Sequence, residues 1–382
     1  MSYIENKNFF TELTNHSFAK VQLLQEYITP WIRKVTLGCN SKCLICDTFA
    51  GEGIYEDGTL GSPMIILKSA LEYLKQPLSR HEEVNLVFIE ADKESYLKLK
   101  HNLENELNCV LIDDDINKVC ENLTILISNS THESLLEELL ESVPNLIPSL
   151  FFVDPFGFKG ISFNNLKKLL TRYNSCEVII NFMYEEFNRF KSGANIDETL
   201  TNFFGSDVSV FKEKTKYMNP QERRNYIIRE YKNNFINSGV RYTLDFDIQK
   251  DDSIAYKMSL IFASNNLTGF NVMKNTMLNL CKNIYFEYRT HENKTMNLFS
   301  FCEMDLVLSE MANILYNDLK GQSLTKQQVE LYCKKHEFIP VDKMASILRL
   351  LAEDNKVIII KNGVKKLNPK RFPNEAIIEF SR

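Results

Sequence analysis

Short apolar runs alternate with amphipathic stretches from residue 42 to residue 182, and this alternation predicts a parallel sheet wrapped by helices. The expected strands are Lys42–Ile45, Val84–Ile89, Leu123–Ile127, Leu150–Val153 and Glu177–Phe182. The helices expected between them are Pro63–Leu74, Lys93–Leu107, His132–Glu141 and Phe163–Tyr173. The pattern therefore predicts a doubly wound α/β domain.

The sequence on either side of this pattern is mostly helical in character. We assign residues 1–40 to an N-terminal helical segment, in which Pro30 is expected to kink or end the helix. The sheet domain is assigned to residues 41–299, and its residues 184–238 carry no strand signal and predict a helical insertion. After the insertion we expect the strands Arg241–Asp247 and Tyr256–Ala263 and the helix Gly269–Cys281.

The last part of the chain, residues 300–382, has a different pattern. Three amphipathic helices are expected there: Leu308–Leu319, Lys326–Lys335 and Val341–Glu353. A hairpin of Val357–Ile360 and Val364–Leu367 follows, joined by an Asn-Gly turn. Three helices followed by a hairpin predict a winged-helix domain, a module that binds DNA in some proteins and docks proteins in others.

Composition places the chain among soluble globular proteins. Of its 382 residues 44% are hydrophobic and 25% are charged, which excludes disordered and fibrous classes. No apolar run approaches the ~18 residues of a membrane span, and the N-terminal residues lack a signal-peptide pattern, so we expect a cytoplasmic protein. Nine cysteines in so large a chain indicate reduced thiols or metal ligands.

Charge is distributed unevenly over the chain. The formal net charge is −5, but residues 82–142 hold 15 acidic and 4 basic side chains. Residues 212–232 hold 7 basic and 3 acidic side chains, with tyrosines interleaved, a combination that suits phosphates and bases. The candidate nucleic-acid-binding residues are Lys212, Lys214, Lys216, Arg223 and Arg224. The alternative is that these runs are solvated faces.

A glycine loop with several acids follows the first expected strand. It reads Asp47-x-Phe49-x-Gly51-x-Gly53, and its two glycines allow a tight turn and close approach to a ligand. A dinucleotide would place pyrophosphate among these carboxylates, and Glu56 occupies the third glycine position of the dinucleotide motif. S-adenosylmethionine (SAM) carries a sulfonium and an ammonium group, so charge favours SAM. A purely structural loop remains open.

Two further residues are candidates for holding the adenosine part of SAM. Glu90 ends the second expected strand, where a carboxylate can accept both ribose hydroxyl hydrogens. Asn129 follows the third expected strand and offers an amide to the adenine amine.

The fourth expected strand ends in Asp154-Pro155-Phe156-Gly157, a pattern suited to an amine acceptor. A carboxylate and a backbone carbonyl accept the two amine hydrogens, and this frees the nitrogen lone pair from conjugation with a base. The aromatic ring stacks on that base. The candidate catalytic residues are therefore Asp154, Pro155 and Phe156; the alternative is a strand-end Asp that caps the next turn.

The spacing Cys39-x-x-x-Cys43-x-x-Cys46 matches the cluster motif of radical-SAM enzymes. Two of its members fall on the first expected strand, where side chains alternate between faces and cannot surround one cluster. We therefore expect no iron–sulfur site. The six histidines have no ligand spacing, so no metal site is predicted.

These motifs together resemble a known family. The residues that carry the resemblance are His16, Lys20, Tyr27 and Trp31, then the segments Asp47–Gly53, Gly61–Pro63, Asp154–Gly157 and Leu260–Ser264. In this order they resemble the bacterial three-Cys-motif partner proteins over residues 15–285. The resemblance implies a Rossmann-like class I SAM-dependent methyltransferase fold. The Asp-Pro-Phe-Gly box is also similar to that of tRNA guanine-N2 dimethyltransferases, which implies a nucleic-acid amine as acceptor.

Two functions from different classes follow. The first is an enzyme, a SAM-dependent methyltransferase acting on an exocyclic amine of RNA or DNA. The second is a binding subunit with the same fold that docks a radical-SAM-like or other partner and transfers no methyl group. The family resemblance also suggests a role in bacterial defence against phage.

Overall fold

The computed structural model describes residues 15–37, 41–76, 82–190, 197–250, 255–289, 300–361, 364–366 and 375–381. The described residues form two compact units. The first lies within Met1–Phe270 and Tyr288–Thr290, and the second within Asn271–Glu287 and His291–Arg382. Most of the helix that was expected to close the sheet domain therefore belongs to the second unit.

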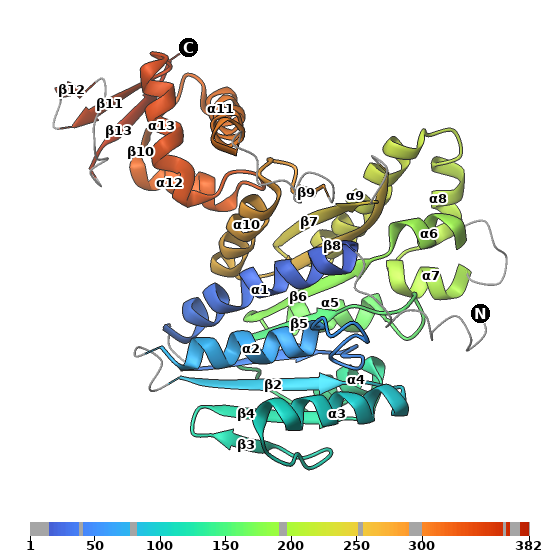
Figure 1. Ribbon diagram of the computed structural model, residues 1–382. Coiled ribbons are helices and arrows are strands. Elements are labelled where there is room, and N and C mark those ends of the chain that lie inside the picture. The colour runs from blue at the N-terminus through green and yellow to red at the C-terminus, as the bar shows by residue number, and fades with distance from the viewer. Residues whose placement is uncertain are drawn as a thin grey trace. The chain divides into compact units, whose positions relative to one another are not determined.

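The first unit is built on a mixed, mostly parallel sheet of nine strands with the order β3-β4-β2-β1-β5-β6-β8-β7-β9 (Figure 1). Neighbouring strands are parallel from β4 to β6, whereas β3, β8 and β7 pair antiparallel with their neighbours. The strands are β1 Lys42–Asp47, β2 Glu83–Ile89, β3 Asn117–Cys120, β4 Leu123–Ser128, β5 Ser149–Val153, β6 Cys176–Phe182, β7 Tyr242–Gln249, β8 Tyr256–Ser264 and β9 Glu287–Tyr288. The expected doubly wound α/β fold is confirmed.

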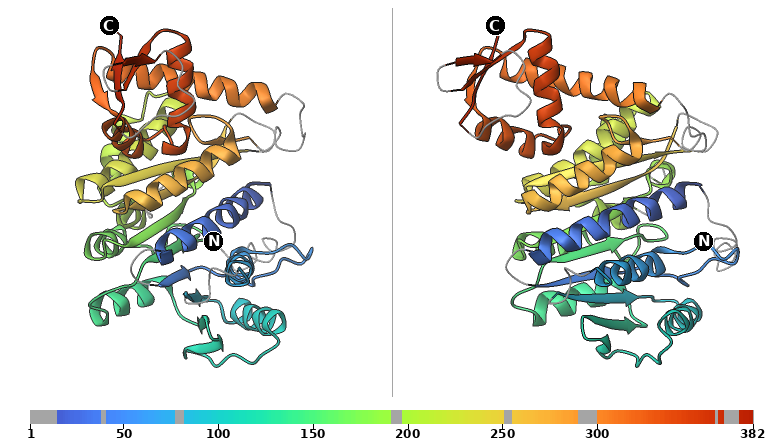
Figure 2. Two further views of the ribbon diagram at one scale, coloured as in Figure 1. Left: turned by 90° about the vertical axis from the view of Figure 1, so that its left-hand side faces the viewer. Right: turned by 60° about the vertical axis from the view of Figure 1, so that its left-hand side comes forward.

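Helices cover both faces of this sheet (Figures 1 and 2). One face carries α1 Asn15–Val35, α2 Ser62–Leu74 and α3 Lys93–Leu107. The other face carries α4 His132–Ser142 and α5 Phe163–Arg172. Strands β5 and β6 are buried along their whole length, as strands covered on both faces must be.

The insertion after β6 is helical, as expected. It contains α6 Tyr184–Phe190, α7 Asp197–Phe204, α8 Val208–Lys214 and α9 Pro220–Asn237. Its aromatic side chains continue the core on the α5 side of the sheet. Tyr231 lies parallel to Phe203 with ring centroids 5.3 Å apart, and Phe235 contacts Phe163 at 4.5 Å. This packing makes the insertion part of the first unit rather than an appendage.

Helix α1 does not end at Pro30, one of the two outcomes expected there, and continues to Val35. Its apolar stripe is buried, with Tyr27 and Trp31 fully inaccessible to solvent. The Tyr27 hydroxyl donates to the buried carboxylate of Glu177 on β6 at 2.5 Å. Burial raises the pKa of Glu177 to about 7. A buried tyrosine–carboxylate contact therefore fixes this helix on the sheet.

The second unit contains α10 Leu267–Cys281 from Asn271 onward, α11 Ser300–Leu319, α12 Lys326–Lys335 and α13 Met344–Glu353, the last preceded by a 3₁₀ turn at Val341–Lys343. Its antiparallel sheet has the order β10-β13-β11-β12, formed by β10 Ser323–Thr325, β11 Val357–Lys361, β12 Val364–Lys366 and β13 Ile377–Phe380. The expected Asn362-Gly363 turn lies outside the described residues. Strands β10 and β13 were not expected from the sequence.

Within the second unit a buried lysine joins α10 to α12. The Lys274 ammonium donates to the backbone carbonyls of Cys333, Lys334, His336 and Ile339 at 2.8–3.1 Å. Burial lowers its pKa to about 7. No described helix of either unit is long and apolar enough to cross a membrane.

Candidate active site at the sheet switch point

The site follows from the strand order. The chain proceeds from β1 toward β2 and β4 on one side, and then resumes at β5 on the other side of β1. Ligands of open α/β sheets bind at such a reversal, beyond the carboxyl ends of the strands. Asp47 ends β1 and pairs in register with Phe152 on β5, two residues before Asp154. The carboxylates of Asp47 and Asp154 therefore lie at the ends of neighbouring strands, at the switch point.

The glycine loop after β1 has the conformation that its sequence requires. Gly51 and Gly53 have φ of 62° and 80°, values that favour glycine. A Cβ on Gly53 would also lie 3.0 Å from the side chain of Leu99. The Gly61 amide donates to the Gly53 carbonyl at 2.8 Å. This hydrogen bond closes the loop of residues 54–60, which precedes α2. Both glycines are structurally required.

Asp47 lies beneath this loop and is fully buried. Burial raises the pKa of its carboxyl to about 7, and the nearby Ser62 side chain and Phe49 amide oppose this rise. The Phe49 amide donates to Oδ1 at 3.2 Å. The other oxygen, Oδ2, has no hydrogen-bond partner among the described residues. A buried carboxylate oxygen without a partner is costly, so Oδ2 is suited to a ligand donor.

The Glu90 carboxylate supports the loop from the end of β2. Its Oε2 accepts from the Gly51 amide and its Oε1 from the Asp92 amide, both at 2.8 Å. Burial raises the pKa of Glu90. Asn129 donates its amide to the backbone carbonyls of Glu90 and Ala91 at 2.8 and 3.1 Å. Glu90 and Asn129, the two residues predicted to bind adenosine, therefore lie at the same edge of the sheet, and each already forms hydrogen bonds with the backbone.

Asp154 is held by two side chains that sequence analysis did not connect with it. Its Oδ2 accepts from the Lys20 ammonium of α1 at 2.6 Å, and its Oδ1 accepts from the Asn181 amide of β6 at 2.6 Å. Pro155 is buried, whereas the ring of Phe156 is 53% exposed. An exposed aromatic ring beside a held carboxylate is the arrangement expected for stacking and hydrogen bonding of an acceptor.

A pocket joins the glycine loop to the Asp154 segment. Its described lining residues are Lys20, Phe49, Ala50, Gly51, Glu52, Gly53, Ile54, Tyr55, Gly61, Ser62, Asp154 and Phe156. Predicted cofactor-binding and catalytic residues therefore line one cavity. Asp47, Pro155, Glu90 and Asn129 are not among its described lining residues; Asp47 is fully buried, and Glu90 contacts the pocket wall through the Gly51 amide.

Sequence reasoning assigned no role to three residues at this site. Lys20 is 134 positions from Asp154, and only the family resemblance singled it out. Tyr55 lines the pocket from the loop, and burial raises its pKa. His132 stacks on Phe49 with ring centroids 5.3 Å apart, and burial lowers its pKa to about 4, so the ring is neutral. A lone histidine at a helix start gave no signal of this contact.

The cysteine pattern does not form a site in the described residues. Cys43 and Cys46 are both buried on β1, three positions apart, so they face opposite sides of the sheet. Burial raises the pKa of both thiols. Cys39 lies outside the described residues. No group of three or more potential metal ligands occurs among the residues that the structure describes.

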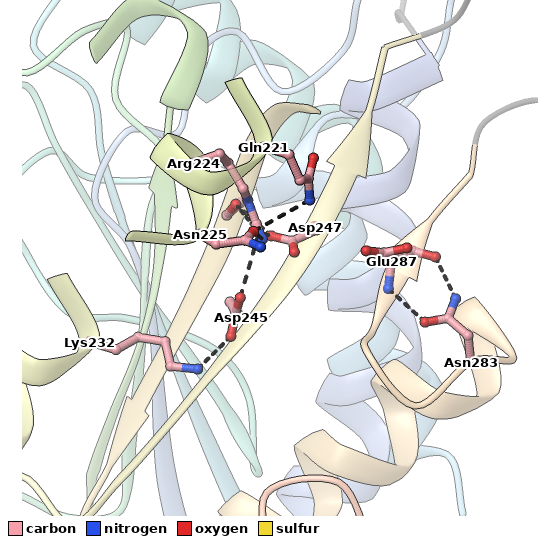
Figure 3. A network of polar contacts seen from close by, with 9 residues as sticks. Gln221, Arg224, Asn225, Lys232, Asp245, Asp247, Asn283 and Glu287 are labelled. Atoms are coloured by element: carbon pink, nitrogen blue, oxygen red, sulfur yellow. Dashed lines mark hydrogen bonds and ion pairs between the residues drawn. The ribbon is translucent and has the colours of Figure 1, made fainter. Parts of the chain in front are cut away.

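Arg224 corrects the predicted nucleic-acid interface. It is only 6% exposed and forms an ion pair with Asp247, while Asp245 lies 3.5 Å away (Figure 3). It also donates to the Ser259 hydroxyl at 3.2 Å and lies over the Tyr256 ring at 4.5 Å. A guanidinium enclosed in this way cannot reach a phosphate. The prediction for Arg224 is therefore wrong.

The other predicted basic residues differ in their surroundings. Arg223 is half-buried and donates to the carbonyls of Thr215 and Met218 at the end of α8, which leaves it little freedom. Lys214 and Lys216 are exposed, and Lys216 lies 5.4 Å from the centroid of the Tyr217 ring. The side chain of Lys212 lies outside the described residues. The lysine part of the predicted interface stays a prediction.

The charged groups around the pocket favour SAM over a nucleotide cofactor. The partnerless Oδ2 of Asp47 suits an ammonium group, although Asp47 itself is not among the described lining residues. The Glu52 carboxylate at the wall already forms an ion pair with Lys98 at 2.8 Å. The glycines bring backbone within reach of a ligand, and the buried Asp47 carboxylate beside this loop disfavours a pyrophosphate. The predicted SAM-binding set of Asp47, Phe49, Gly51, Gly53, Glu90 and Asn129 stays a prediction.

Comparison with known proteins gives only distant likenesses. No protein-family model and no curated protein matches the chain. Similar solved structures include protein LPL1258 from Legionella pneumophila, at 12% identity, over 64% of this chain and 85% of that one, with a TM-score of 0.34.

Two further solved structures are distantly similar to this chain. Trm1 from Pyrococcus horikoshii, solved with SAM, is 11% identical over 68% of this chain and 58% of that one, with a TM-score of 0.37. This chain thus matches little more than half the length of Trm1. A putative rRNA methylase from Clostridium thermocellum is 7% identical over 62% and 96%, with a TM-score of 0.29. The chain is thus distantly similar in structure to SAM-dependent methyltransferases.

Proposed function

We propose that this protein is a SAM-dependent methyltransferase that acts on an exocyclic amine of a nucleic acid. The observation that carries the proposal is the shared pocket at the switch point. It is lined on one side by the loop over Asp47 and on the other by Asp154 and Phe156. A cofactor bound on the first side would have its reactive end near an acceptor bound on the second.

The residues would act as follows. When bound, SAM supplies an electrophilic methyl group on a sulfonium sulfur. Asp47 Oδ2 accepts hydrogen bonds from an ammonium group, and Glu90 accepts from ribose hydroxyls with the lone pairs that its backbone contacts leave free. Asp154 accepts an N–H hydrogen of the acceptor amine, and Phe156 stacks on its base.

A nucleic-acid acceptor is supported by exposed groups beyond the pocket. Lys214, Lys216 and Tyr217 are exposed on the insertion, and the Tyr217 side chain is 89% exposed. Cations interleaved with aromatic rings contact phosphates and bases. The helix–strand–helix–helix–strand order of the second unit supports a winged-helix domain, which we propose as a further contact for the nucleic acid or for a protein partner.

The test is a tritiated-SAM assay with total host RNA, host DNA and phage DNA as separate acceptors. We expect label in one nucleic acid, lost with Asp154→Ala and retained with Lys159→Ala, an exposed lysine in the segment after β5. Mass spectrometry of the digested nucleosides then identifies the methylated base. Label in none of the acceptors would contradict the proposal.

The second candidate, a binding subunit without transfer activity, is favoured by one observation. Both Asp154 oxygens already accept hydrogen bonds, from Lys20 and Asn181. A protein that binds SAM, co-purifies with a stoichiometric partner and labels no acceptor would be this subunit. Under this proposal Asp154 has a structural role only.

A further inference from the structure

Asp154 is part of a three-residue cluster assembled from separate parts of the first unit. Lys20 comes from α1, Asp154 follows β5, and Asn181 lies on β6. Both contacts to the carboxylate measure 2.6 Å. Asn181 is 2% exposed, so the carboxylate is fixed from behind by a buried amide. The cluster therefore holds Asp154 in one orientation at the pocket wall.

The ion pair in this cluster is shielded from water. The side chains of Lys20 and Asp154 are 10% and 18% exposed, and both line the pocket. A pair so shielded is screened far less by solvent than a surface pair. Lys20 is the only basic residue among the described residues of the pocket wall. It therefore sets the local charge where the acceptor would lie.

The position of Lys20 follows from the packing of α1. Tyr27, two helical turns further along, is fully buried and bonded to Glu177, so the helix has little freedom to shift along the sheet. The ammonium of Lys20 thus reaches Asp154 from a fixed backbone. A different lysine of the same helix, Lys34, is exposed and has no such contact.

We propose that Lys20 is a specificity-determining residue that selects an uncharged amine as the acceptor, an inference that rests on the proposed function. Its ammonium neutralises the charge of the Asp154 carboxylate. A cationic acceptor such as a lysine side chain would therefore find no unpaired carboxylate to bind and would be repelled by the Lys20 ammonium. An uncharged exocyclic amine meets no such repulsion. Its N–H hydrogen can still be accepted, because each carboxylate oxygen has two lone pairs and one protein donor.

The chemistry of transfer agrees with this selection. A protonated alkylammonium has no lone pair to attack a methyl group, and it would first have to lose a proton. An exocyclic base amine is uncharged at neutral pH and needs only orientation. With Lys20 removed, the unpaired Asp154 carboxylate would attract cations, and the preference should move toward them.

The experiment has a binding arm that needs no methyl transfer. Saturation-transfer NMR measures binding of cytidine, adenosine, guanosine and butylammonium in the presence of S-adenosylhomocysteine, with Asp154→Asn identifying signals from this site. Wild type and Lys34→Met should bind a nucleoside and exclude butylammonium. Lys20→Met should bind butylammonium at least about tenfold more tightly, the scale of one charge-assisted contact, and Lys20→Arg should restore exclusion.

A transfer arm distinguishes failure of this inference from failure of the proposed function. Labelled SAM is offered with nucleic acid and with polylysine, and Lys20→Met should lower the ratio of label in nucleic acid to label in polylysine. If the wild-type protein labels neither acceptor, the proposed function is overturned. Only the binding experiment then tests the role of Lys20. Butylammonium binding to wild type as tightly as any nucleoside, no nucleoside binding at all, or unchanged selectivity in Lys20→Met overturns the inference. If Lys20→Met does not fold, Lys20→Gln keeps a hydrogen-bond donor and takes its place.

Discussion

The Lys20–Asp154 pair and the Arg224–Asp247 pair are both shielded contacts between a basic residue and an aspartate. The first lines a cavity, and each oxygen of its carboxylate accepts one hydrogen bond from a described side chain. The second is enclosed by Asp245, Ser259 and the ring of Tyr256. The same two residue types therefore form a candidate reaction site in one place and a structural clamp in the other.

The difference lies in what surrounds each pair. Arg224 joins α9 of the insertion to β7 and β8, so all its partners belong to the fold. Lys20 and Asp154 lie at the switch point, where the sheet itself leaves space between strand ends. Whether a charged residue is functional is thus decided by the topology around it.

The largest effect should come from removing the enclosed cation. Arg224→Met leaves Asp247 buried without its partner, and we expect a loss of about 3–5 kcal/mol in the free energy of unfolding. Denaturant unfolding measures it. Arg229→Met, on the exposed side of the same helix, should cost under about 1 kcal/mol. Equal losses in the free energy of unfolding for the two variants would show that the enclosed Arg224 does not stabilise the fold more than an exposed arginine does.

In the pocket, removal of the carboxylate should affect reaction rather than folding. Asp154→Ala should lower methyl transfer by about 10²-fold or more, because the acceptor amine loses its hydrogen-bond acceptor in the transition state. SAM affinity, followed by calorimetry, should be nearly unchanged. A variant that transfers methyl as fast as wild type would leave Asp154 without a catalytic role.

Loss of the exposed ring should weaken acceptor binding. Phe156→Ala removes the stacking surface at the pocket, and we expect a cost of about 1–3 kcal/mol, seen as a higher apparent KM for nucleic acid with kcat little changed. Val110→Ala, which removes an exposed apolar side chain from the acidic part of the first unit, serves as control. An unchanged KM in Phe156→Ala would exclude stacking.

The smallest expected effect is a pH dependence of SAM binding. Burial raises the pKa of Asp47 to about 7, so its carboxyl is mostly protonated at pH 6 and mostly ionised at pH 8. Only the ionised form attracts an ammonium group, so SAM affinity should rise about tenfold between these values. Asp47→Asn should remove most of this dependence. Affinity that falls as the pH rises would contradict the assignment of Asp47.

Much of the fold could be predicted because local patterns determine it. Helices α3 and α12 have the predicted bounds, since Asp92 and Thr325 cap their first turns and the apolar spacing continues to their ends. The edge strand β3 was missed because four residues of half-exposed character carry little periodicity. Helix α1 continues past Pro30 because burial of the surrounding helix outweighs one lost backbone hydrogen bond.

The candidate site could be predicted only where its residues are close in sequence. The glycine loop and the Asp154 segment were found from their own spacing. The Lys20–Asp154 contact joins residues 134 positions apart, and no local sequence pattern predicts it. Arg224 and Arg229 have the same charge and lie on the same helix, but only packing against β7 shows that one is enclosed. Tertiary contacts decide these roles.

Calorimetric titration of the wild-type protein with SAM at pH 8 tests the central claim most directly. The account predicts one binding site per chain, weakened by about 1–3 kcal/mol in Asp47→Ala or Glu90→Ala, the scale of a lost charge-assisted hydrogen bond. Lys34→Ala, an exposed change on α1, should bind as wild type does. Tight NADH binding with no heat from SAM would contradict the claim that the switch-point pocket holds SAM.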